Sequence, residues 1–271
     1  MPTHASNDTA THSGVNVYLQ SKDGLSTDNN SNCNFYLDTI ITPDRADLGM
    51  MVSVIDAEIP YSFYNITAKN NSLTLNDIVL ELTERNYNAY NIVDEFNSLF
   101  KSKPTLSNVV MSFDDNSNKF TITSPSEVTL VSTTMSEELG ATNLPQTTDS
   151  YTSNQACNLS GTSSIYIRSD NMNVRNINSF GKNNGVLSKV LVTSPPGNFI
   201  FYQPSTPQYF VLNNPLSYIN IQMLNDDNEF IDFNGLNWSL TLSIEFFRKR
   251  DDSINYKYYL DGVPDNQIKD V

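Results

Sequence analysis

The sequence predicts a mainly β protein, a single jelly-roll sandwich with a small inserted α+β subdomain. Three observations support this. Short segments with a two-residue apolar period recur along the chain, separated by turn residues. Asparagine occurs 36 times, and it favours turns and positive φ angles. Helical periodicity is clear in one region only, which indicates an insertion between two β-rich parts.

The first β-rich part begins at Val15, where apolar and polar residues start to alternate as in a strand. A longer apolar run at residues 50–59 predicts a central strand, and Pro60 ends it because proline cannot donate to the ladder. We expect a Thr/Ser/Asn-rich linker at residues 144–155. The second β-rich part then follows, with its clearest half-buried strand at residues 238–246.

The region between these parts differs in its sequence pattern, because it combines a helical spacing of apolar residues with short strands. Asn88 is a suitable helix cap, and the apolar residues after it recur at helical spacing. Two strands flank the polar turn at residues 114–118, as in a hairpin. Gly140 stands where a helical turn needs a left-handed residue. We therefore predict an inserted α+β subdomain.

A length of 271 residues suits one sandwich with an insertion. The predicted division is a disordered N-terminal arm at residues 1–14, a jelly-roll domain at residues 15–71 and 145–250, the inserted subdomain at residues 72–144, and an acidic C-terminal tail at residues 251–271.

The charge balance excludes some partners. The net charge is −14, and a phosphate-binding surface needs lysine and arginine, so we expect no direct contact with nucleic acid. No apolar run is long enough for a membrane span, and the first residues lack an apolar signal core. Folding in a reducing cytoplasm is expected, so Cys33 and Cys157 are interpreted as small apolar residues rather than a disulfide.

No catalytic, cofactor-binding or metal-binding residues are predicted. The two histidines, His4 and His12, lie in the polar leader, where neither is expected to be held against a partner. The scattered glycines form no phosphate loop. We therefore expect no enzyme activity and no cofactor.

Two acidic clusters are interpreted as polar hairpin turns, with calcium binding as the alternative, because neither has the spacing of a calcium loop. Their members are Asp114, Asp115, Asn116 and Asn118, and Asp226, Asp227, Glu229 and Asp232. Three aromatic residues after Pro60 have two interpretations. Phe63 is expected in the core, whereas Tyr61 and Tyr64 could also form an exposed platform for a carbohydrate or a partner.

The order of several short segments resembles the penton proteins, the vertex minor capsid proteins of virophages and Polinton-type viruses. These belong to the lineage with adenovirus-like double-jelly-roll capsids. The matching segments are Ser21-Lys22-Asp23 with the Thr/Asn/Ser-rich loop after it, Asn34-Phe35-Tyr36-Leu37, Ile59-Pro60-Tyr61-Ser62-Phe63-Tyr64-Asn65-Ile66, Asn86-Tyr87-Asn88-Ala89, Leu139-Gly140-Ala141, and the block from Ile219 to Leu242.

The resemblance implies a structural virion protein that forms homopentamers at the five-fold vertices of an icosahedral capsid. The implied partners are trimers of the major capsid protein around the vertex, and a host receptor or glycan through residues 72–144. The implied location is the virion, after assembly in the host cytoplasm. The alternative is a jelly-roll carbohydrate-binding or attachment module, and native mass separates the two.

Overall fold

The computed structural model describes residues 14–131, 133–172 and 185–249. Both histidines, the acidic tail predicted at residues 251–271 and nearly all of the predicted N-terminal arm lie outside the described residues. Gly14, which we placed in that arm, instead begins the first strand.

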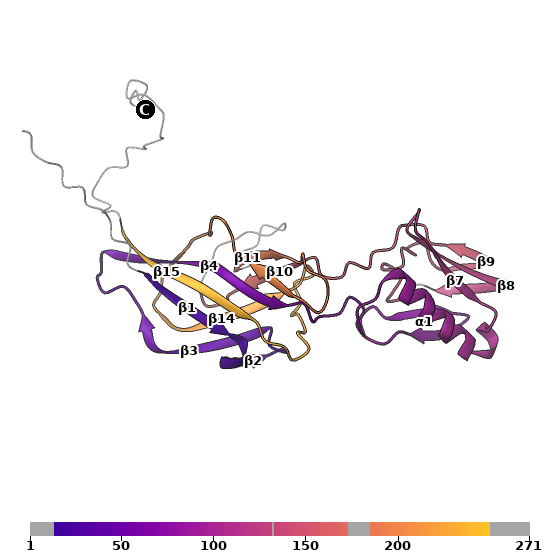
Figure 1. Ribbon diagram of the computed structural model, residues 1–271, viewed down its shortest axis with the longest axis horizontal. Coiled ribbons are helices and arrows are strands. Elements are labelled where there is room, and N and C mark those ends of the chain that lie inside the picture. Colours follow the sequence, from indigo (N-terminus) through magenta and orange to yellow (C-terminus); the bar gives the residue numbers. More distant parts are fainter. Residues whose placement is uncertain (1–13, 132, 173–184, 250–271) are drawn as a thin grey trace, which may run out of the picture.

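The larger body is a sandwich of two antiparallel five-stranded sheets (Figure 1). Sheet A contains β1 (Gly14–Gln20), β15 (Ser239–Arg248), β4 (Leu48–Pro60), β12 (Phe199–Tyr202) and β13 (Phe210–Leu212). Sheet B contains β11 (Val186–Leu191), β10 (Ser164–Arg168), β14 (Leu216–Leu224), β3 (Asn32–Ile41) and β2 (Leu25–Thr27). A short 3-10 helix, η1 (Ser21–Asp23), follows β1.

The strand order is that of a jelly roll. In chain order the eight principal strands are β1, β3, β4, β10, β11, β12, β14 and β15. The first, eighth, third and sixth lie side by side in sheet A, and the fifth, fourth, seventh and second lie side by side in sheet B. The predicted fold class is therefore confirmed.

One apolar core fills the sandwich. The inward residues of both sheets form a single buried cluster, which includes Val54, Ile167, Ile221 and Leu242. The predicted strand at 238–246 lies in the middle of sheet A as β15, between β1 and β4, and its alternating apolar residues point into this core. The two-residue period predicted both the strand and its buried face.

The smaller body is built from the chain between β4 and β10. Its sheet has the order β6 (Ile78–Glu81), β5 (Ser72–Leu75), β8 (Lys119–Val131) and β7 (Val110–Asp114), and β9 (Gln146–Thr152) also pairs with β8. The helix α1 (Ala89–Ser102) is followed by a short 3-10 helix, η2 (Pro104–Leu106).

Helix α1 begins where the sequence predicted. The side chain of Asn88 accepts a hydrogen bond from the backbone N–H of Asn91 at 2.9 Å, which caps the first turn. Its buried face carries Ile92, Phe96 and Phe100, which belong to the core of the inserted body. This core shares no residue with the sandwich core.

The prediction of a linker at residues 144–155 is wrong, because β9 occupies most of this segment. β9 pairs with β8, and Tyr151 is buried in the core of the inserted body. On the other side that core begins at Ile66, before the expected boundary at residue 72. The inserted body therefore extends beyond residues 72–144 at both ends.

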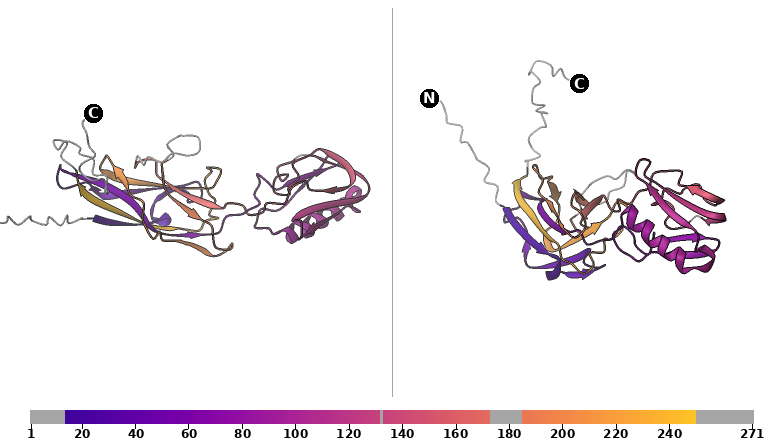
Figure 2. Two further views of the ribbon diagram at one scale, coloured as in Figure 1. Left: turned by 90° about the horizontal axis from the view of Figure 1, so that it is seen from above. Right: turned by 45° about the vertical axis from the view of Figure 1, so that its right-hand side comes forward.

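The two bodies lie end to end in all three views (Figures 1 and 2). β4 runs from Leu48, which pairs with Arg248, to Pro60, after which the chain leaves for the inserted body. Thirteen extended residues span roughly 40 Å. The ends of the described chain therefore lie at the end of the sandwich remote from the insertion. Among the described residues, no helix has the length and apolar character needed to cross a lipid bilayer.

Candidate functional site

Two chain segments form the neck between the bodies, one after β4 and one before β10. The side-chain amide of Asn65 holds them together. Its Nδ2 donates to the carbonyls of Tyr87 and Leu159, both at 2.8 Å, and its Oδ1 accepts from the backbone N–H of Tyr87 at 2.8 Å. All three bonds are possible because an amide carries both donors and an acceptor.

Gly161 completes this contact. Its φ is +61°, and a Cβ there would lie 2.8 Å from the Cβ of Asn65. A larger residue would therefore be strained by its backbone and would also push Asn65 aside. The neck thus depends on an asparagine and a glycine that are far apart in sequence.

The substitution Asn65→Asp tests this clamp. It keeps the acceptor for Tyr87 but places a carboxylate oxygen against two carbonyl oxygens, so we expect a loss of stability of roughly 1–3 kcal/mol in the neck. Amide hydrogen exchange should become faster at Tyr87 and its neighbours. Asn108→Asp in an exposed turn is the matched control, and equal exchange in both variants would contradict the role of Asn65.

Of the three aromatic residues after Pro60, only one is on the surface. Tyr61 and Phe63 are buried and stacked, with ring centroids 4.4 Å apart, and burial raises the pKa of Tyr61. Phe63 also meets Phe233 edge to face at 6.3 Å. Tyr64 is 38% exposed. The core interpretation therefore holds for Tyr61 and Phe63, and only Tyr64 could serve as a platform.

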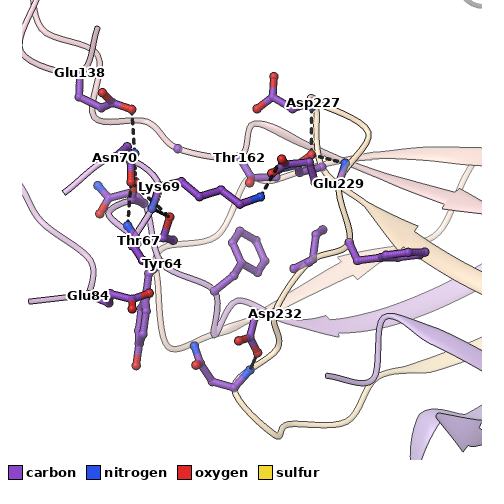
Figure 3. A pocket seen from close by; sticks show the side chains of 18 of the residues that line it. Tyr64, Thr67, Lys69, Asn70, Glu84, Glu138, Thr162, Asp227, Glu229 and Asp232 are labelled. Carbon is purple, nitrogen blue, oxygen red and sulfur yellow. Dashed lines mark hydrogen bonds and ion pairs between the residues drawn. The ribbon is translucent and has the colours of Figure 1, made fainter. Parts of the chain in front are cut away.

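A pocket of about 620 Å³ lies beside the neck and is lined by residues of both bodies (Figure 3). Lys69 crosses it and pairs with Glu229, with Nζ and Oε1 2.7 Å apart. Tyr64, Glu84, Asp227 and Asp232 also line it. The lining is rich in oxygen acceptors, and none of the described residues that form it is a histidine or a cysteine. Such a surface can accept hydrogen bonds from hydroxyl groups or amines, and Tyr64 adds an aromatic face.

Of the two acidic residues of the β7–β8 turn, Asp114 stabilises the turn itself and Asp115 contacts helix α1. Asp114 accepts from the backbone N–H of Asn116 at 3.2 Å and from the hydroxyl of Ser117 at 2.6 Å. These hydrogen bonds, the Ser117 one foremost, lower the pKa of Asp114. Asp115 accepts from the hydroxyl of Tyr90, and this hydrogen bond raises the pKa of Tyr90.

The acidic residues after β14 have different surroundings: Asp227, Glu229 and Asp232 line the pocket beside the neck, whereas Asp226 contacts the start of β10. Asp226 accepts from the backbone N–H groups of Ser163 and Ser164, at 2.7 and 3.1 Å, at the start of β10. Asp232 accepts from the backbone N–H of Asn234 at 2.8 Å. Within the described ranges, no group of three His, Cys, Asp or Glu side chains could hold a metal ion.

The two cysteines lie in different bodies. Cys33 is buried in the sandwich core, and Cys157 is half-buried against the core of the inserted body. Both are free, and burial raises the pKa of each thiol.

The fold and site define a class: a single jelly roll with a separately packed body inserted between its third and fourth strands. No protein-family model matches the chain, and no curated protein matches it. Among solved structures it is similar to the crystal structure of the mavirus penton protein. The identity is 13% and the TM-score 0.46, over 87% of this chain and 99% of that one. A similarity of this size carries no functional argument, and the fold assignment rests on the strand order.

Proposed function

We propose that the chain is a structural virion protein without catalytic activity, a penton that occupies the five-fold vertices of an icosahedral capsid as a homopentamer. Its neighbours there are trimers of the major capsid protein. The inserted body faces outward and is available to a host receptor or glycan.

The observation that carries this proposal is the position of the insertion. It leaves from one end of β4, while the described chain ends lie at the other end of the same strand. A sandwich of this kind can stand in a shell with one end inward and the other displayed. Because jelly rolls serve many functions, the fold alone does not decide. The ordered sequence segments that resemble pentons give the proposal its particular form.

Native mass of the purified protein tests the assembly, both alone and after mixing with its major capsid protein. We expect a pentamer, because only head-to-tail contacts generate a closed five-fold ring. Electron microscopy of reconstituted shells should place it at the vertices. A stable dimer or tetramer, with empty vertices in the shells, would contradict the proposal.

One observation favours the rival function of a carbohydrate-binding or attachment module. The neck pocket places the exposed ring of Tyr64 near carboxylates and amides (Figure 3). A monomer that binds glycans on an array, with binding lost in Tyr64→Ala, would support the rival in place of the capsid proposal.

A further inference from the structure

An exposed apolar patch with one acidic residue lies on the outer face of sheet A; we call it patch A. Phe199 and Phe201 on β12 are 47% and 72% exposed, with ring centroids 6.4 Å apart. Glu58 of β4 lies directly opposite Phe201 in the strand register. It is exposed and has no ion-pair partner among the described residues. Large exposed aromatic residues are typical of an interaction surface, and polar residues commonly surround them.

A patch of opposite charge lies on the outer face of sheet B; we call it patch B. Lys189 of β11 lies opposite Tyr166 of β10, with its Nζ 5.4 Å from the centre of the tyrosine ring. Leu191, two residues further on the same face of β11, is 61% exposed. In the described part of the chain no carboxylate pairs with Lys189.

The two patches flank the same edge of the sandwich on opposite outer faces. β11 and β12 follow each other in the chain, and each lies at an edge of its sheet. Their inward side chains meet, because the hydroxyl of Ser188 donates to that of Tyr202 and both Val190 and Ile200 lie in the shared core. The patches are therefore back to back, separated by the thickness of two sheets.

We propose that patch A of one copy docks on patch B of the next copy, and that this contact closes the ring; the inference rests on the proposed function. Charge complementarity identifies a second copy as the occupant. Contact of patch A with patch B joins Glu58 to Lys189 and covers the apolar residues of both patches. Patch A against patch A would oppose two Glu58 side chains, and patch B against patch B two Lys189 side chains. Such like-charge contacts disfavour a two-fold dimer through either patch, so the head-to-tail arrangement is favoured.

Charge reversal tests the contact. Glu58→Lys or Lys189→Glu alone places like charges together, and each is expected to weaken association by about tenfold or more in sedimentation velocity over a concentration series. The double variant restores the opposite pair and should return to within about threefold of the original protein. Glu81→Lys and Lys101→Glu on the inserted body are the matched controls, and they should assemble normally.

A pair of introduced cysteines tests the contact even if the pentamer dissociates readily, because a disulfide traps the associated copies covalently. In a Cys157→Ala background, the variant Phe201→Cys/Leu191→Cys should form, under oxidation, a ladder of covalent oligomers that ends at five. The two new cysteines of one chain cannot join each other, because they lie on opposite faces of a sandwich about 10 Å thick. Either single-cysteine variant should stop at dimers.

The outcomes separate this inference from the proposed function. If the original protein forms pentamers while both single charge reversals assemble normally and no ladder appears, the ring contact lies elsewhere and the inference is wrong. If the original protein forms a two-fold dimer instead, the proposed function fails with it. The inference would also be overturned if the protein stayed monomeric and a glycan or another protein bound to the patches and protected the new cysteines from oxidation.

Discussion

Replacing Leu242 with alanine is expected to lower the free energy of unfolding of the sandwich by roughly 2–5 kcal/mol. Leu242 is fully buried on β15 and lies opposite Val17 of β1 and Val54 of β4 in the strand register. The loss combines the transfer of the leucine side chain out of water with the cavity that its removal leaves. Chemical denaturation measures it.

The neighbouring residue provides the control. Ser243 points to the outer face of the same strand and is half-exposed, so Ser243→Ala should change the free energy by no more than about 0.5 kcal/mol. Equal stability of the two variants would show that Leu242 of β15 is not packed in the core in solution.

Replacing residues 66–159 with a short Gly-Ser linker should leave a folded sandwich. No residue of the sandwich core lies in this range. The two ends already meet at the neck, where Asn65 contacts Gly161, so the closure entropy of a short connection is small. A single cooperative transition in chemical denaturation, with native-like circular dichroism, is the expected result.

A shorter deletion is the informative comparison. Removing only residues 72–144 would keep β9 without β8 and would expose Ile66 and Tyr151, which are buried in the missing core. That variant should aggregate at concentrations where the longer deletion remains monodisperse. Unfolding of the longer deletion would show that the sandwich needs the inserted body.

The sequence alone predicted those elements in which the spacing of apolar residues reflects which side chains are buried. Apolar and polar residues alternate strictly over residues 238–246 because one face of β15 packs on the core. Helix α1 was predicted from its cap, Asn88, and from the helical spacing of its apolar residues. β9 was missed because its sequence, QTTDSYT, contains only one apolar residue, Tyr151. Polar contacts accompany its pairing with β8, including hydroxyl pairs between Thr121 and Thr152 and between Thr129 and Thr147, both at 2.9 Å.

The neck could not be predicted from local pattern. Asn65 and Leu159 are separated by 94 positions, and an asparagine in a turn-rich sequence suggests only a turn. Likewise, the sequence left Tyr61 and Tyr64 open together, because their different exposure depends on the stacking of Tyr61 against Phe63. Patch A could not be predicted either, since it combines β4 and β12, which are distant in the chain; patch B combines the consecutive strands β10 and β11.

The separation of the two cores has an evolutionary consequence. Because none of the described side chains belongs to both cores, a substitution that weakens the inserted body does not lower the stability of the sandwich by loss of shared packing. The inserted body can therefore accumulate substitutions at a rate that the sandwich could not tolerate. Sequences of related proteins should accordingly diverge faster between Ile66 and Leu159 than in β4, β14 and β15, with Asn65 and Gly161 retained at the boundary.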